Sequence, residues 1–444
     1  MTRSRAPRMA LQTLEGRLAP ANLTVAFSPL THVLTVTGDN EANDLTVQGD
    51  GSDPTHFTLT STGTINGVAG PFSTPSGVRS MAIRLLANND QVGFGNVPGV
   101  HLTGFLSIDG GDGANTVLAS GLAVGKGFTI TNGLGNDTTT LTDVSIGGSL
   151  TVRNGSGDST VKVARASTSI PAIGGSVLII NGAGRDTTDL TDVNVGGGVI
   201  VRNGLADATG IAGSTQIFNN FNPGFRSQIR GGVSVSFLDG DQFGASSLSD
   251  VEVGGDVTFA FGPGVFTANF DAFSVLQPVV VRGNLTVTGT GAGTVNLGEV
   301  YSSGGLVVGK ALRVTTGSAA DNVNMFNVEV GGATNLKLGD GDNNVTIDDS
   351  LFVGAFNLTT GAGGDTFQID TKTTTTAATT FKRPVTIIEG AGVDNLTLAG
   401  GINFFQAVVV LSTFRVHHGS EADVFTPNAA DLIFPFGTAL EYVV

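Results

Sequence analysis

The sequence predicts an all-β fold, a single-stranded right-handed parallel β-helix (β-solenoid) with about 22 residues per coil. Three observations support this fold class: short segments repeat at a fixed spacing, apolar and polar residues alternate within them, and turn-forming residues separate them. Residues 121–143 read GLAVGKGFTITNGLGNDTTTLTD, and residues 144–165 and 328–349 follow the same pattern. A repeat that cannot bury its apolar side alone must stack on its neighbours, which produces a solenoid.

Each repeat predicts three short strands and three corners. An apolar run ends in Gly-Gly or Gly-Lys, and an alternating strand such as residues 150–152 follows it. A turn of the form G-x-G-x-[D/N/S] then leads into a second alternating strand, such as residues 161–163. Alternation with a period of two marks half-buried strands, and Gly, Asn and Asp favour the corners between them.

The repeat length is the spacing between the polar residues that close the G-x-G turns. It is 22 residues in two blocks, which are closed by Asn115, Asp137 and Ser159 and by Asp321, Asn343 and Asp365. The next closing residues, Asp186 and Asp394, follow after 27 and 29 residues. These longer intervals predict insertions in loops on one side of the stack. A propeller blade would need about 40–45 residues, so the period favours the solenoid.

The composition agrees with a β-solenoid and narrows the classes of partner. Of the 444 residues, 40% are hydrophobic and only 13% are charged, against about 25% charged in a typical domain. The net charge of −15 repels phosphates, so we expect no nucleic acid partner. Cysteine is absent, so packing must supply the stability. No stretch of about 20 apolar residues occurs, and we expect no membrane-spanning segment.

The expected organisation is one domain behind a short leading segment. Residues 1–21 are expected as an export, sorting or capping segment, and residues 22–444 as a single solenoid. Residues 206–280 are less regular and rich in Phe, which we expect to stack inside the core. Residues 401–444 are expected as a C-terminal cap, because uncovered strand edges pair with other chains.

The leading segment suggests a destination for the protein. The run Leu14-Glu15-Gly16-Arg17-Leu18-Ala19-Pro20 follows an Arg-rich stretch and resembles the LEPR-XLL type segment at the start of many large planctomycete surface and secreted proteins. Gly16 stands where that family often has Pro. The resemblance implies export to the cell surface or beyond it. The residues also allow an amphipathic helix over 8–18 that caps the solenoid, and the apolar core of an ordinary signal peptide is missing.

The G-x-G-x-[D/N] turns are candidate calcium-binding segments. Residues 361–365 and 390–394 weakly resemble the Gly- and Asp-rich nonapeptide of calcium-binding RTX repeats, which implies Ca²⁺ as a ligand. This chain has one copy per 22 residues or more, whereas RTX rolls carry tandem copies. The alternative is that Gly, Asp and Asn serve only as corners. The candidate metal ligands are Asp340, Asp342, Asp348, Asp349, Asp365 and Asp394.

The sequence favours a non-enzymatic function. Many parallel β-helices are polysaccharide lyases or glycosidases, whose chemistry needs clustered carboxylates with a base nearby. Asp348-Asp349 and His417-His418 lie about three coils apart in the sequence, so we do not expect them to meet. We expect a structural or adhesive protein at the cell surface or outside the cell, which presents loops to polysaccharide or other surface proteins. A carbohydrate-active enzyme and a calcium-binding module are the alternatives.

Overall fold

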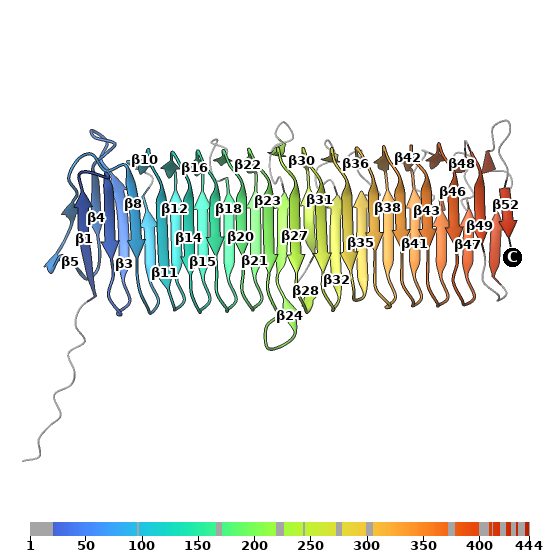
Figure 1. Cartoon of the computed structure of the whole chain (residues 1–444), viewed down its shortest axis with the longest axis horizontal. Helices are drawn as coiled ribbons and strands as arrows, with labels where there is room; N and C mark the ends of the chain where they lie inside the picture. The colour runs from blue at the N-terminus through green and yellow to red at the C-terminus, as the bar shows by residue number, and fades with distance from the viewer. Residues whose placement is uncertain are drawn as a thin grey trace, which may run out of the picture.

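The computed structural model describes residues 21–443 except 96, 166–170, 219–225, 243–244, 272–277, 299–304, 372–377, 399–407, 411, 418–422, 428–431 and 434–439. These residues form strands and turns, and no helix occurs among them. The strands stack into one straight rod, with the chain running from one end to the other (Figure 1). The fold is the right-handed parallel β-helix that the sequence predicts.

One coil illustrates the repeating unit. β13 (Ala123–Val124) is a short strand, β14 (Phe128–Asn132) is a long one, and β15 (Thr138–Thr142) is a second long one. In the next coil, β16 (Ser145–Ile146), β17 (Leu150–Arg153) and β18 (Thr160–Ala164) pair with them in parallel. Phe128 pairs with Leu150 and Thr138 with Thr160, so the 22-residue period of the sequence is the period of the coil.

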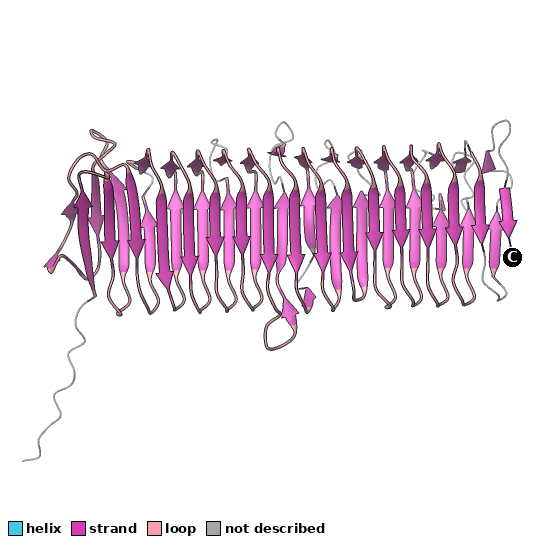
Figure 2. Ribbon diagram, viewed as in Figure 1, coloured by secondary structure: helices cyan, strands magenta, loops and turns pink. Residues whose placement is uncertain are grey.

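The stacked strands form three sheets along the rod (Figure 2). The first long face runs from β2 (Val33–Thr37) to β52 (Leu440–Val443), and the second long face from β3 (Asp44–Gly49) to β50 (Val424–Pro427). The short face runs from β10 (His101–Leu102) to β51 (Leu432–Ile433). About 16 coils at the interstrand spacing of about 4.8 Å give a rod on the order of 75 Å long.

Three rows of corners join the faces, and each row has its own residue types. The Gly-Gly corner leads from the short face to the first long face, as at residues 147–149. The G-x-G corner leads from the first long face to the second, as at residues 133–137. The Asp corner leads from the second long face back to the short face, as at Asp143, whose φ is 51°.

The core is a single column of apolar side chains inside the coils. Alternate residues of each long strand point inward, so Phe128 and Ile130 of β14 and Leu150 and Val152 of β17 are fully buried. Five Phe residues of the Phe-rich middle stack in the core as predicted, Phe218 is half-buried, and the predictions for Phe221, Phe225, Phe243 and Phe273 lie outside the described residues. The rings of Phe237 and Phe261 lie 5.5 Å apart. The buried Phe residues of this region are Phe237, Phe259, Phe261, Phe266 and Phe270.

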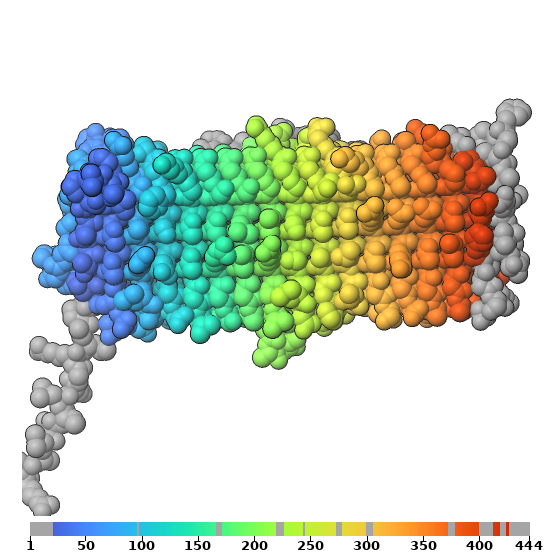
Figure 3. All heavy atoms as spheres, in the orientation of Figure 1, coloured from blue at the N-terminus to red at the C-terminus, as the bar shows by residue number. Residues whose placement is uncertain are grey.

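The longer intervals of the sequence leave the stacking intact. The two extra segments fall between β18 and β19 (Ala172–Ile173) and between β44 (Thr366–Ile369) and β45 (Thr380–Phe381), which is the Asp corner in both cases. β18 still pairs in register with β21 (Thr187–Thr191), the next strand of its face. A third extra segment lies at the G-x-G corner, where β24 (Ile211–Ala212) and β28 (Asp241–Gln242) form a two-stranded ribbon that protrudes from the rod (Figure 3).

The N-terminal end is closed by antiparallel strands that the sequence analysis did not predict. β1 (Asn22–Ser28) pairs antiparallel with β2, and β4 (Phe57–Thr60) pairs antiparallel with β3 and with β7 (Phe72–Ser73). The predicted segment 1–21 lies outside the described residues, apart from residue 21. At the other end, β49 (Phe414–His417) and β52 still continue the parallel pairing within residues 401–444. Among the described residues, no helix is long and apolar enough to cross a membrane.

Candidate functional site: acidic corners and surfaces

The G-x-G corner requires glycine because successive corners touch. Gly135 has a φ of 138°, and a Cβ atom there would lie 2.2 Å from the carbonyl oxygen of Gly113 in the preceding coil. The polar residue that closes the corner points inward and binds the backbone of the coil before it. Asp137 Oδ1 accepts the N–H of Asn115 at 2.9 Å, and Asp365 Oδ1 accepts the N–H of Asn343 at 2.9 Å. We call this row of closing residues the corner ladder.

Asn and Asp differ in the hydrogen bonds that they make in the corner ladder. Asn343 Nδ2 donates to the carbonyl oxygens of Gly339 and Gly341 at 3.0 and 2.9 Å. Asp137 has an acceptor oxygen in place of that amide, and its buried Oδ2 has no hydrogen-bond donor. Burial therefore raises the pKa of Asp137 to about 6. It likewise raises the pKa of Asp90 and of Asp186 to about 7.

The six predicted metal ligands fall into three separate places. Asp340 and Asp342 are exposed in one G-x-G corner and accept the N–H groups of Ala362 and Gly364, each at 2.8 Å. Asp365 and Asp394 are buried members of the corner ladder, in which Asp394 Oδ1 accepts the N–H of Asp365 at 2.7 Å. Asp348 and Asp349 lie at the Asp corner, which is the other end of the second long face.

The Asp corner places Asp370 beside Asp348 and Asp349. One carboxylate oxygen of each residue lies within 4.8 Å of the others. Asp370 accepts the backbone N–H of Thr379 at 3.1 Å and its hydroxyl at 3.2 Å. Burial raises the pKa of Asp370, while hydrogen bonds from Asp348 and Thr379 oppose that rise.

A second carboxylate group lies where the corner ladder meets the first long face. Glu389, Asp394 and Asp423 bring carboxylate oxygens within 4.8 Å of one another. Burial raises the pKa of Glu389 to about 8, and repulsion from Asp394, Asp423 and Asp365 adds to the rise. The sequence analysis included Asp394 but missed its two partners. The period would have found Asp423, which follows Asp394 by the same 29 residues that separate Asp365 from Asp394.

These groups offer hard oxygen donors, the ligand type that Ca²⁺ selects, but only three carboxylates each against the six to eight oxygens that it takes. The sequence analysis missed Asp370, although it follows Asp348 by one repeat of 22 residues. The two catalytic candidates are apart: His417 ends a strand of the first long face, and Asp348 ends one of the second. His418 lies outside the described residues.

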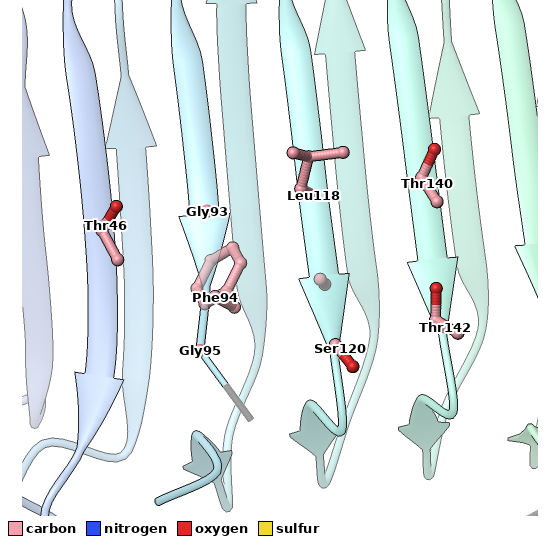
Figure 4. Close-up of a pocket in the computed structure, with 9 residues that line it drawn as sticks. Thr46, Gly93, Phe94, Gly95, Leu118, Ser120, Thr140 and Thr142 are labelled. Carbon is pink, nitrogen blue, oxygen red and sulfur yellow. The ribbon is translucent and has the colours of Figure 1, made fainter. Parts of the chain in front are cut away.

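A shallow groove lies on the second long face near its N-terminal end (Figure 4). Gly93 of β9 (Gln91–Phe94) has no side chain and sits between Thr46 and Leu118 of the neighbouring strands, which leaves a gap of about 280 Å³. Leu118 is 40% exposed there. The groove is otherwise lined by Phe94, Gly95, Ala119, Ser120, Thr140 and Thr142. The groove is therefore an open, mainly apolar hollow with Thr and Ser hydroxyl groups among its lining.

The charged side chains at two rows of corners are mostly of opposite sign, while the long faces carry further exposed cations such as Arg84, Arg153 and Arg313. The Gly-Gly corner carries exposed cations, which we call the basic edge: Arg79, Lys126, Arg230, Arg282, Lys310, Lys382 and Arg383. The G-x-G corner carries the acidic edge, whose members are Asp112, Asp158, Asp239, Asp241, Asp340 and Asp342. In the described parts of these corners, the exceptions are Asp256 at the basic edge and Arg185 at the acidic edge.

No family model, no curated protein and no solved structure matches this chain.

Proposed function

We propose that this protein is a non-enzymatic structural rod of the cell surface or extracellular space, whose faces serve for adhesion. The observation that supports this proposal most is the unbroken parallel stack, in which strands of the first long face pair coil after coil from β8 (Ser80–Arg84) to β52. Every coil shares one core and bonds to both neighbours, so the rod resists bending and holds its faces at fixed distances. The location rests on the resemblance of residues 14–20.

The location is tested by fractionating native cells and by protease treatment of intact cells. The full chain is expected in the envelope or the medium and open to protease. A Glu15→Ala/Arg17→Ala variant is expected to stay inside, while the matched control Arg313→Ala/Glu329→Ala, which changes exposed residues of the rod, is exported. Recovery of the full chain from the cytosol would exclude the surface location.

A calcium-binding role is the second candidate, because Asp348, Asp349 and Asp370 converge at one corner. Bound calcium would stabilise the folded chain by mass action. The test compares thermal unfolding in ~5 mM CaCl₂ with unfolding in excess chelator, for the native chain and for Asp349→Asn. A rise in Tm with calcium that Asp349→Asn removes supports a site there. Equal Tm values in calcium and chelator would remove this candidate.

A further inference from the structure

The basic and acidic edges lie on opposite sides of the rod. Each strand of the first long face begins at the Gly-Gly corner and ends at the G-x-G corner, so the full width of that face separates the two edges. In Figure 1 the short-face strands lie along the top of the rod and the G-x-G turns along the bottom. The molecule therefore carries a charge difference across its width in addition to its net charge of −15.

The charged groups of both edges are available to a partner. The seven cations of the basic edge are exposed, and Arg282 keeps a 65% exposed side chain while it pairs with Glu252. Five of the six acidic-edge carboxylates are exposed and the sixth, Asp158, is half-buried. Asp340 and Asp342 each bind one backbone N–H through Oδ1, which leaves the other oxygen for a second interaction.

We propose that the basic edge of one copy binds the acidic edge of a second copy, so that rods associate side by side. Both edges run along the same stack of coils, so every charge on either edge lies at a whole multiple of about 4.8 Å along the axis. The seven cations of the basic edge fall at six corners, and the six carboxylates of the acidic edge fall at four. An acidic polymer with more closely spaced charges would match the basic edge less well and would leave the acidic edge unused. The inference rests on the proposed structural role and names its partner.

This contact joins two different surfaces. After two rods pair, one of them still offers a free basic edge and the other a free acidic edge. A heterologous contact of this kind does not close upon itself and produces open arrays. A few rods laid edge to edge make a ribbon, and continued addition makes a flat layer one rod thick.

Light scattering and negative-stain microscopy of the purified full chain test the proposal. At ~50 mM salt, we expect association that rises with protein concentration and disappears at ~0.5 M salt, because screening shortens the range of charge interactions to a few Å. The basic-edge variant Arg230→Glu/Lys310→Glu/Lys382→Glu is expected to stay monomeric at both salt concentrations. An excess of this variant is expected to shorten the arrays of the native chain. Its acidic edge still binds the basic edge of a native rod, but its own altered basic edge cannot bind the next rod.

The control variant is Arg153→Glu/Arg202→Glu/Arg313→Glu, which changes the net charge equally but on the first long face. It is expected to associate like the native chain. Equal behaviour of the two variants, or a native chain that stays monomeric at ~50 mM salt, would overturn the proposal. If the native chain stays monomeric, its binding to dextran sulfate is measured next. Binding by the native chain and the control variant but not by the basic-edge variant would assign the basic edge to an acidic polymer. Both readouts use purified protein, so they are independent of the location test above.

Discussion

At the scale of single residues, the corner ladder shows why Asp and Asn alternate in one structural position. Both accept the N–H of the preceding coil through Oδ1, but only the amide of Asn also donates to the corner carbonyl groups. A protonated Asp has an O–H that can donate in the same place. Burial raises the pKa of Asp137 and of Asp186, and repulsion from neighbouring carboxylates adds to the rise.

The ladder predicts a pH dependence of stability that substitution can remove. The pKa of Asp137 is about 6 in the folded chain and about 3.9 in the unfolded chain, so the folded state binds the proton more tightly. Its stabilising contribution is complete below the unfolded pKa and is lost as the pH rises through 6. Asp137→Asn is expected to raise stability at pH 8 by on the order of 1–3 kcal/mol and to leave it nearly unchanged at pH 4.

Chemical unfolding at the two pH values measures the effect of Asp137→Asn. Asp340→Asn is the matched control, because that carboxylate is exposed and already makes its N–H contact through the oxygen that Asn retains. An equal gain for both variants at pH 8 would indicate a general effect of net charge and not of the ladder.

Spacing along the chain could predict which residues form corners but not which carboxylates meet. The 22-residue period assigns Asp137 and Asp365 to one row of corners, as the structure shows. It does not reveal that Asp342 and Asp348 lie at opposite ends of one strand and so cannot share an ion. That separation depends on the length of β41 (Asn344–Asp348), which alternation defines only to within a residue or two.

At the scale of strands, the coils use two ladders of Asn side chains in contrasting surroundings. Inside the rod, Asn132, Asn154 and Asn181 are buried, and each donates to the Oδ1 of the next at 2.9, 2.9 and 2.8 Å, with Asn203 as the last acceptor. On the outer side of the second long face, Asn324, Asn296 and Asn269 form a similar row at 2.9 Å, where they are only partly buried.

The two Asn ladders predict different costs for the same substitution. Asn154→Ala leaves a buried donor on Asn132 and a buried acceptor on Asn181 without partners, so we expect a loss of about 2–4 kcal/mol. Asn296→Ala removes the centre of the outer ladder, where water replaces the lost bonds, and we expect a loss below about 1 kcal/mol. Chemical denaturation of both variants measures the difference, and equal losses would contradict this account.

Strand pairing at the N-terminal end escaped prediction for a physical reason. Alternating apolar and polar residues specify a half-buried strand but carry no information on whether its neighbour runs parallel or antiparallel. β1 and β2 therefore resemble the strands of any other coil in the sequence, and their antiparallel pairing depends on the tight turn at residues 29–32. In that turn, His32 has a φ of 57°.

The antiparallel strands predict the behaviour of a truncated chain. Removal of residues 1–28 takes away β1 and exposes the hydrogen-bonding edge of β2, and exposed strand edges pair with other chains. Size-exclusion chromatography at ~0.5 M salt, where the charged edges are screened, is expected to show oligomers or aggregates. Removal of residues 1–20 leaves β1 in place and is expected to cause no such change. A monomeric chain after the longer truncation would show that β1 does not protect the end.

At the scale of the whole molecule, the rod is built by repetition, and its stability is a sum over coils and their contacts. The insertions after β18 and β44 are accommodated at the Asp corner and a further one at the G-x-G corner, and the strands next to the Asp-corner insertions remain in register. The coil therefore tolerates changes in loop length, while the three faces keep a constant spacing. One repeat is the smallest unit by which the chain can grow without disturbing its cross-section.

Each coil adds the same length to the rod, so the number of repeats sets the length of the molecule. Insertion of three further tandem copies of residues 144–165 is expected to lengthen the rod by about 14 Å and to leave its thickness unchanged. Small-angle scattering at ~0.5 M salt measures both dimensions, and a thicker particle of unchanged length would contradict the expectation. A gene that gains or loses such a segment changes the length of the rod. The fold and the packing of the core within each coil stay the same.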